Sequence, residues 1–256
     1  MGLATAKACL KLWFGFPAHR AGVRSAGCGP AMRASIIGTF FADDPRRRRE
    51  FVIASSRLTH RSWQAETAAL AVAEVVALVI TEPPDNGHVL SVLEGLSAEA
   101  EWQNWVSRIQ SSLEAGDSVS EFVSNVGLYR AVTGYSLHVV SVAIYAWLVH
   151  RHDFRTALIA VLECGGDTDT VGAILGAMCG ATASEEGIPA DWLDALTEWP
   201  RSIGFIRRVA LKLAERSEQP TAQVSYFVPG VILRNFVFFA IVLLHGFRRL
   251  FPPYRR

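Results

Sequence analysis

The sequence has little of what would place it in several common classes of protein. Its four cysteines show no CxxC pair and no metal-ligand spacing, which argues against a disulfide scaffold or a zinc module. Its 25 Lys and Arg balance 24 Asp and Glu, so it lacks the basic excess typical of polyanion binders, and we expect no nucleic-acid partner. No segment is of low complexity, and no repeat of fixed period is visible. A reduced, cytoplasmic protein is therefore expected.

The N-terminus also lacks a convincing export signal. Four basic side chains interrupt the apolar residues of positions 1–22, so no clean apolar core of a signal peptide forms. Leu3, Ala6 and Leu10 recur instead at helical spacing. We expect the chain to begin inside a helical domain.

Helical periodicity runs through nearly the whole sequence, and half of the residues are hydrophobic. One apolar stripe is followed by Gly116, at the position of a C-cap: Trp102, Trp105, Val106, Ile109 and Leu113. Ser118 and Glu121 have the spacing of a capping box, and Asp153 precedes an expected helix over 154–164. Further helices are expected over 64–80 and 136–150. With no alternating strands, the sequence predicts an all-α, multi-helix fold.

The C-terminal part differs in character from the rest. We expect a main domain over 1–216, a polar linker over 217–223, and a hydrophobic helix with a basic tail over 224–256. Residues 224–244 contain Arg234 as the single charge and are long enough to span a bilayer, which needs about 20 apolar residues. Pro229–Gly230 and Arg234–Asn235 argue against a span. A buried C-terminal helix and a membrane-associated one both remain open.

The most informative stretch is Gly165-Gly166-Asp167-Thr168-Asp169-Thr170. Two glycines permit a sharp turn, and two carboxylates and a hydroxyl follow within four residues. Such hard oxygen ligands suit Mg²⁺, which makes Asp167, Asp169 and Thr170 candidate metal ligands. The same residue types also cap helix N-termini, so capping is the alternative. Gly172, Gly176 and Gly180 then recur every four residues, which predicts close backbone packing against another helix.

The string GGDTDTVGAILGAMCGA resembles the metal motif of the ADP-ribosylglycohydrolase family. Two earlier stretches agree with that family in order and spacing: Ser25 to Arg33 resembles its glycine-rich GNGxxMR segment, and Leu58-Thr59-His60 resembles its THxH stretch. The likeness covers about residues 3–215. It implies an all-α hydrolase that binds two Mg²⁺ ions and removes ADP-ribose from modified side chains of proteins or from small-molecule conjugates.

The resemblance also implies roles for individual residues. Asp167, Asp169 and Thr170 correspond to metal ligands. Ser25, Gly27 and Gly29 correspond to residues near the diphosphate, where backbone N–H groups approach anionic oxygens. His60 corresponds to a residue near the ribose. No catalytic acid or base is identified by the match.

Two departures from the family pattern bear on activity. The Asn of the glycine-rich segment is replaced by Cys28, and the family's first metal half-site, a Thr-Asp-Asp, has no counterpart. Asp43 and Asp44 lie on the wrong side of the glycine-rich segment and are expected in a solvated turn. We therefore expect at most one well-held Mg²⁺ and feeble or absent hydrolysis by this apparently truncated chain. A catalytically incomplete ADP-ribose-binding or scaffold module is the alternative function.

One further charge run invites a functional interpretation. Arg46 to Arg49 offers four consecutive cations, which is a pattern that phosphate-binding surfaces share. The run follows Asp43, Asp44 and Pro45 and precedes Glu50. A solvated helix start is therefore predicted in place of a phosphate contact.

Overall fold

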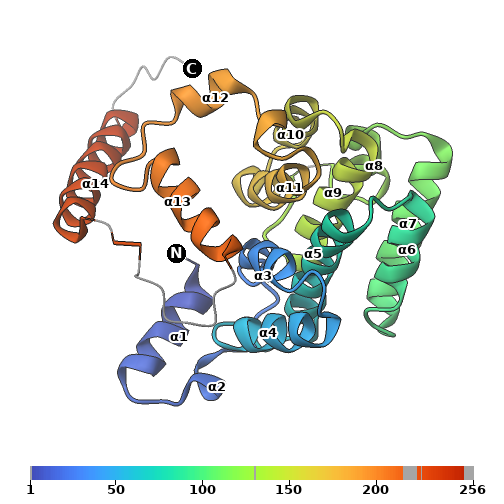
Figure 1. Ribbon diagram of the computed structural model, residues 1–256, viewed down its shortest axis with the longest axis horizontal. Coiled ribbons are helices and arrows are strands. Elements are labelled where there is room, and N and C mark those ends of the chain that lie inside the picture. The colour runs from blue at the N-terminus through green and yellow to red at the C-terminus, as the bar shows by residue number, and fades with distance from the viewer. Residues whose placement is uncertain (1, 130, 216–223, 226, 251–256) are drawn as a thin grey trace. The chain divides into compact units, whose positions relative to one another are not determined.

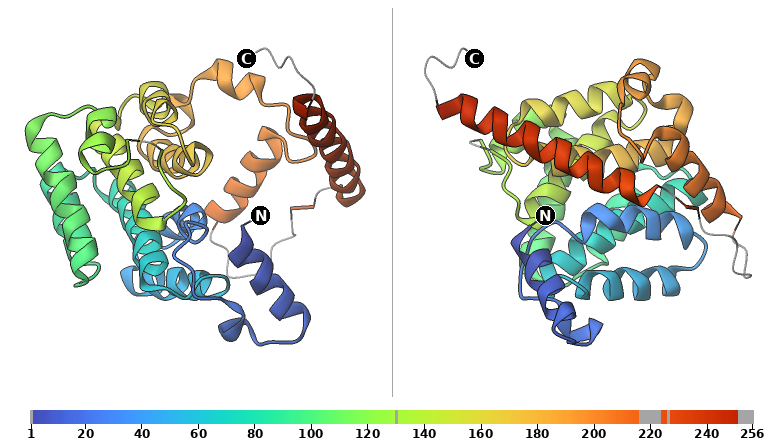
Figure 2. Two further views of the ribbon diagram at one scale, coloured as in Figure 1. Left: turned by 180° about the vertical axis from the view of Figure 1, so that it is seen from behind. Right: turned by 90° about the vertical axis from the view of Figure 1, so that its left-hand side faces the viewer.

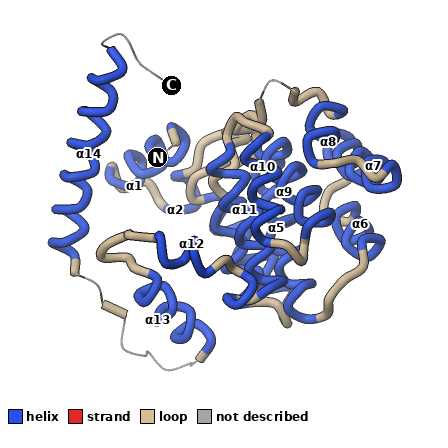
Figure 3. Tube along the Cα trace, turned by 90° about the horizontal axis from the view of Figure 1, so that it is seen from above, coloured by secondary structure: helices blue, strands red, loops and turns tan. Residues whose placement is uncertain are grey.

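The computed structural model describes residues 2–129, 131–215, 224–225 and 227–250, and in these residues the chain is helical without any β-strand (Figures 1 and 3). The all-α prediction is confirmed. The chain divides into two compact units, residues 1–189 and residues 190–256. The expected linker over 217–223 lies outside the described residues. Helices α12 and α13, which precede that linker, group with the C-terminal helix α14.

The first unit contains eleven of the described α-helices. They are α1 (Leu3–Trp13), α2 (Ala18–Ala21), α3 (Ala34–Phe40), α4 (Pro45–Arg57), α5 (Trp63–Thr81), α6 (Asn86–Glu94), α7 (Ala100–Ala115), α8 (Val119–Asn125), α9 (Ser136–His150), α10 (Phe154–Glu163) and α11 (Thr168–Ala183). The second unit contains α12 (Ala190–Ala195), α13 (Ile203–Ala214) and α14 (Val228–Leu250). The views of Figures 1 and 2 agree in placing α3 beside α5.

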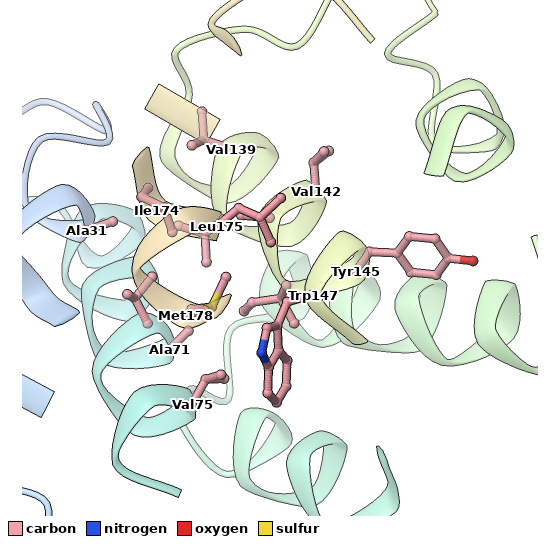
Figure 4. Close-up of a cluster of buried hydrophobic side chains, with 14 of the residues drawn as sticks. Ala31, Ala71, Val75, Val139, Val142, Tyr145, Trp147, Ile174, Leu175 and Met178 are labelled. Carbon is pink, nitrogen blue, oxygen red and sulfur yellow. The ribbon is translucent and has the colours of Figure 1, made fainter. Parts of the chain in front are cut away.

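The core of the first unit forms where α5, α9 and α11 pack together. Ile174, Leu175 and Met178 of α11 lie between side chains of α5 and α9, as Figure 4 shows. Trp147 of α9 is fully buried, and its indole N–H donates to Thr182 Oγ1 at 2.9 Å. Burying an aromatic side chain of this kind stabilises the fold by about 1.5–3 kcal/mol, provided that its polar atom finds a partner. These three helices form the platform on which the candidate site is built.

Local signals at the helix ends are confirmed. Gly116 adopts a left-handed conformation, φ 73°, at the C-cap of α7. Ser118 and Glu121 form the expected capping box at α8. Asp153 caps α10 by accepting a hydrogen bond from the backbone N–H of Thr156. Asp44 caps α4 through Arg47 N, which confirms the turn expected there.

The basic run at the start of α4 departs from its prediction at one residue. Arg48 is buried, not solvated, and its guanidinium donates to Glu74 at 2.6 Å and to the carbonyl groups of Phe41 and Ala42. A buried cation needs such partners because its desolvation cost is otherwise uncompensated. The reason for the error is physical: Glu74 lies on another helix, and local sequence gives no sign of that contact.

The glycines spaced four residues apart in α11 do not lie at the close backbone contact between helices that the sequence predicted. A Cβ atom on Gly172 or Gly176 would meet only side-chain atoms of α10, at 3.8 Å or more, and one on Gly180 would meet nothing within 4 Å. The close helix approach occurs instead at Gly38 of α3, where a Cβ atom would lie 2.5 Å from the carbonyl oxygen of Ala73. Buried residues such as Leu175 and Met178 occupy the other face of α11. The prediction of close backbone packing along this run is therefore wrong.

The C-terminal helix α14 contains the apolar stretch noted in the sequence. Pro229 and Gly230 fall in its first turn, where proline removes no intrahelical hydrogen bond, so they do not break it. Two described helices are long and apolar enough to cross a membrane, α5 and residues 228–249 of α14. α5 is a core helix, with 61% of its apolar window buried, whereas for α14 the buried share is 6%. The interpretation of α14 as a buried helix is therefore not supported.

An added methyl group is expected to have opposite effects on stability at Gly38, which lies against a neighbouring helix, and at Gly180, which lies in open space. We expect Gly38→Ala to destabilise the protein by about 1–3 kcal/mol, because the new Cβ atom would overlap the backbone of Ala73. Gly180→Ala should stabilise it by about 0.5–1 kcal/mol, because the site is open and alanine favours the helix. Urea unfolding of both variants checks the signs, and equal effects would contradict the packing described.

Candidate active site

The turn between α10 and α11 sets the position of the candidate carboxylates. Gly165 and Gly166 adopt left-handed conformations, with φ 70° and 86°. A side chain at Gly166 would also collide with the backbone of Val132. Only glycine satisfies both constraints at low cost, which explains the Gly-Gly pair before Asp167.

A segment far away in the sequence holds this turn in place. The backbone N–H of Val132 donates to the Gly165 carbonyl at 3.3 Å, and the N–H of Asp167 donates to the Val132 carbonyl at 2.8 Å. Val132 is buried, so these bonds are shielded from water. Asp167 is thereby fixed against the loop that precedes α9.

The side chain of Asp167 does not cap helix α11. It occupies the N-cap position of α11 but makes no side-chain capping bond. Its Oδ1 accepts a hydrogen bond from the hydroxyl of Thr170 at 2.8 Å, and its Oδ2 lies 3.7 Å from the sulfur of Cys28. Asp169 does engage the backbone, since its Oδ1 accepts from Thr170 N at 2.9 Å. The capping alternative therefore fails for Asp167 and holds in part for Asp169.

Asp167 and Thr170 bring two oxygen atoms, the donor type that Mg²⁺ prefers, close together. In an octahedral Mg²⁺ site with bonds of about 2.1 Å, neighbouring ligand oxygens lie about 3.0 Å apart. The 2.8 Å between Asp167 Oδ1 and Thr170 Oγ1 is close to that value, and it is also the ordinary length of the hydrogen bond that joins these two atoms. Among the described residues, no group of three or more His, Cys, Asp and Glu side chains could hold a metal ion. A metal-binding role for Asp167, Asp169 and Thr170 therefore stays a prediction.

The glycine-rich segment lies beside this carboxylate. Val23 N and O pair with the backbones of Thr59 and Arg61, at 3.1 and 2.9 Å. At the other side of the segment, the N–H of Ser136 donates to Ala26 O at 2.8 Å. Between these anchors, Cys28 extends toward Asp167. Two of the predicted regions, near residues 28 and 167, are therefore in contact.

His60 lies directly against the two glycines predicted to face the diphosphate. A Cβ atom on Gly27 would lie 3.1 Å from His60 Nε2, and one on Gly29 would lie 3.1 Å from His60 Cε1. The imidazole is buried, with 4% of the residue exposed. The His60 ring therefore packs against the glycine-rich loop. Its position near a ribose stays a prediction.

Ser25 is oriented by its own loop. Its hydroxyl oxygen accepts a bond from the N–H of Gly27 at 3.4 Å, and its carbonyl accepts one from the hydroxyl of Ser62 at 2.8 Å. These contacts fix the conformation of the loop. The roles of Ser25, Gly27 and Gly29 remain predictions.

Arg33 joins the glycine-rich loop to His60, a function that the sequence interpretation missed. Its guanidinium donates to Gly29 O at 2.9 Å and to Thr59 Oγ1 at 2.8 Å, and the Thr59 oxygen lies 2.8 Å from His60 Nδ1. Burial and the charge of Arg33 both lower the pKa of His60, so the neutral imidazole is favoured. Arg33 is the last residue of the glycine-rich segment that resembles the family. That resemblance was the sequence feature that could have identified it.

The loop before α9 contributes a second polar cluster. Tyr135 pairs with Gly27 in an isolated backbone bridge and donates its hydroxyl to Glu101 at 2.7 Å. Burial and the Glu101 carboxylate raise the pKa of Tyr135 to about 12. His138 packs its ring between Tyr135 and Trp105, and its Nδ1 lies 2.8 Å from Thr133 Oγ1. No motif of the sequence analysis indicated this cluster.

A basic cleft of about 430 Å³ adjoins the start of the same glycine-rich loop. Lys11, Arg24 and Arg61 line it, together with Gly22 and Val23. Three cations around one cleft produce a positive potential that attracts anionic groups. Arg24 directly precedes Ser25, and Arg61 directly follows His60. The electrostatics of this region therefore favour an anionic ligand.

The geometry of the turn between α10 and α11 predicts that alanine at Gly166 destabilises the protein much more than alanine at Gly165. We expect Gly166→Ala to destabilise the protein by about 2–4 kcal/mol, because it combines φ strain with a collision against Val132. Gly165→Ala should cost about 1 kcal/mol, from strain alone, because its Cβ atom would meet nothing within 4 Å. Urea denaturation measures both values. Similar losses in the two variants would contradict the pairing of this turn with Val132.

The environment of His60 predicts a pH dependence of stability. Its folded-state pKa lies below the unfolded value of about 6.5, so the unfolded chain binds more protons as the pH falls through that value. The contribution of His60 is present above about pH 6.5 and is lost below it. The stability difference between wild type and His60→Gln should therefore shrink between about pH 8 and pH 5.5. The exposed His152→Gln serves as the control, and a constant difference for His60→Gln would contradict the burial described.

Comparisons with known proteins agree with this architecture. The ADP-ribosylglycohydrolase family profile matches residues 1–223. An uncharacterised protein of Archaeoglobus fulgidus is 31% identical over 217 residues, which are 84% of this chain and 67% of that protein. The ADP-ribosyl-[dinitrogen reductase] glycohydrolase of Rhodospirillum rubrum is 26% identical over 171 residues, which are 67% of this chain.

A solved structure, an ADP-ribosylglycohydrolase-related protein complex, shares the fold with a TM-score of 0.62 at 24% identity. The match covers 83% of this chain and 67% of that chain. The chain spans about two thirds of the archaeal relative and only 51% of the Rhodospirillum rubrum glycohydrolase. Because the family profile matches most of its length, the chain belongs to the ADP-ribosylglycohydrolase family.

Proposed function

We propose that this protein is a hydrolase that removes ADP-ribose from modified protein side chains or from related small-molecule conjugates, with the help of Mg²⁺. The observation that carries the proposal is the orientation of Asp167. Its carboxylate makes no helix cap, meets the Thr170 hydroxyl at 2.8 Å, and faces the glycine-rich loop at Cys28. An acidic group held in this way beside a loop of glycines is suited to a polar ligand and its cation.

The chain's own residues suggest how the ligand would be held. Glycine at positions 27 and 29 lets the loop pack against His60, and the N–H of Gly27 is bonded to Ser25 Oγ. The remaining backbone N–H groups of the loop would bind anionic oxygens. Arg33 holds the loop by donating a hydrogen bond to Gly29 O. The basic cleft at Arg24 and Arg61 adds positive potential. This arrangement favours a diphosphate at the loop and a ribose toward Asp167.

A metal ion would be held by Asp167 and Thr170, with Asp169 as a further oxygen donor at the exposed edge. When bound, Mg²⁺ orients ribose hydroxyls and a water and stabilises charge that changes at the anomeric carbon. The oxygen donors of these residues suffice for one ion and leave it mainly hydrated. We therefore propose slow turnover for this chain.

Cys28 supports the same expectation of slow turnover. The thiol takes the place of an amide that offers both a donor and an acceptor, and a thiol forms weak hydrogen bonds. Burial and the neighbouring Asp167 carboxylate raise the pKa of Cys28, so the neutral thiol is favoured and adds no negative charge. Its contribution to substrate binding is correspondingly small.

The experiment is a hydrolysis assay with carboxylate variants. The substrates are peptides that carry ADP-ribose on arginine or on serine, and released ADP-ribose is measured with Mg²⁺ and with EDTA. We expect slow, Mg²⁺-dependent release that falls at least about tenfold in Asp167→Asn, the loss of one metal ligand being of that order or larger. Asp153→Asn is the matched control, because it makes the same change at a helix cap away from the site.

Each other outcome has a defined meaning. Turnover that is unaffected by EDTA and by Asp167→Asn would overturn the proposed metal role. Tight binding of free ADP-ribose without any turnover would favour the alternative function, an ADP-ribose-binding or scaffold module. Rapid turnover, typical enzymes having kcat of about 1–1000 s⁻¹, would contradict the proposal that one weak ion limits the reaction.

A further inference from the structure

The second unit has no apolar core in the part that the structure describes. Between residues 190 and 250, no described hydrophobic side chain is buried. Helices in water draw most of their stability from burying an apolar face, so exposed apolar helices need something to cover them. This requirement is strongest at α14.

α14 is exposed on all sides from Asn235 to Arg249, whereas Gly230, Val231 and Arg234 near its start are buried or partly buried. Within residues 228–249, an 18-residue window has a mean hydropathy of 1.9 and is 6% buried, and the whole segment contains no Asp or Glu. The four consecutive residues Phe236, Val237, Phe238 and Phe239 are each at least 53% exposed. Since successive residues of a helix turn by about 100°, these four side chains point to all sides. A protein partner would cover one face of such a helix, whereas a lipid bilayer surrounds it.

The length of α14 also suits a bilayer. The 22 residues of Val228–Arg249 form a helix about 33 Å long, close to the hydrocarbon thickness of about 30 Å. Arg234 lies in the first third of the helix, where its guanidinium pairs with Glu198 at 2.6 Å and lies over the ring of Phe238 at 5.0 Å. Arg248 and Arg249 mark the other end. Long side chains at the end marked by Arg248 and Arg249 reach the headgroup layer, whereas Arg234 lies about 9 Å inside the other end, with its charge paired by Glu198.

The charge of the C-terminal part is complementary to anionic lipids. Residues 200–256 contain ten Lys and Arg and two Glu, whereas residues 1–199 contain fifteen Lys and Arg and 22 Asp and Glu. A near-neutral chain thus has a strongly basic end that coincides with its exposed apolar helix. Basic residues beside a membrane contribute about 1 kcal/mol each near an anionic surface.

We propose that α14, with its basic flanks, attaches this protein to an anionic phospholipid bilayer. The inference does not depend on the proposed hydrolase activity, because it uses none of the residues of the candidate site. Most of the attachment comes from burial of the exposed Phe, Leu, Ile and Val side chains of α14 in the bilayer. The basic residues select membranes that contain anionic headgroups.

Vesicle flotation tests the proposal on the full chain. The chain is synthesised in a cell-free system with phosphatidylcholine vesicles that either contain or lack phosphatidylglycerol. We expect it to float with the anionic vesicles, to resist extraction by high salt, and to float less with pure phosphatidylcholine. Phe239→Asp with Leu243→Asp should reduce the floating fraction at least about tenfold, because charges near the centre of an apolar helix are costly in lipid.

The matched control is Phe51→Asp with Ile36→Asp, which places the same charges on exposed apolar positions of the first unit. This double variant should float like wild type. The proposal is overturned if the folded chain floats with neither vesicle, if high salt releases it, or if the α14 variant floats as well as the control. A dimer that depends on α14 and binds no vesicles would also overturn it, because a second copy would then cover the helix.

Discussion

The candidate site depends on the backbone pairing of Val132 with Gly165 and Asp167. Two hydrogen bonds join segments more than thirty residues apart, and they close only because Gly166 has no side chain to strike Val132. The pairing turns the Asp167 carboxylate toward Cys28 instead of leaving it to cap α11. Without this constraint, the Asp-Thr-Asp-Thr stretch would be an ordinary helix start.

A second set of contacts brings the glycine-rich loop to that carboxylate. Backbone bonds fix the loop on one side to Thr59 and Arg61 and on the other to Ser136, while Arg33 and His60 fill the space beneath it. The resulting surface combines a glycine-rich loop, an acidic group and nearby cations. These are the elements from which a site for a diphosphate-linked ribose and one cation would be built, and they rest on the rigid core of α5, α9 and α11.

The sequence predicted features that depend on local chemistry and missed those that depend on distant contacts. Helical periodicity predicted α9 over Ser136–His150 to the residue, and Asp153 and Ser118 were identified as caps, because these signals lie within a few residues of one another. Arg48 was expected in solvent, and the glycine run of α11 was expected at a close helix contact. Both errors have one cause: the partner that decides the outcome, Glu74 or the backbone of Ala73, lies on another helix. In the site, motif resemblance identified the separate segments, but the contacts of Arg33 and Val132 required the fold.

Binding of a cation by Asp167 and Thr170 beside the glycine-rich loop is the central requirement of the proposed function. The most direct measurement is the anomalous scattering of crystals grown with Mn²⁺, which substitutes for Mg²⁺ at oxygen sites. We predict one peak within bonding distance of Asp167 Oδ1 and Thr170 Oγ1, on the side that faces Cys28. A fully occupied Mn²⁺ elsewhere, with none at this pair of oxygens, would contradict the proposed metal site.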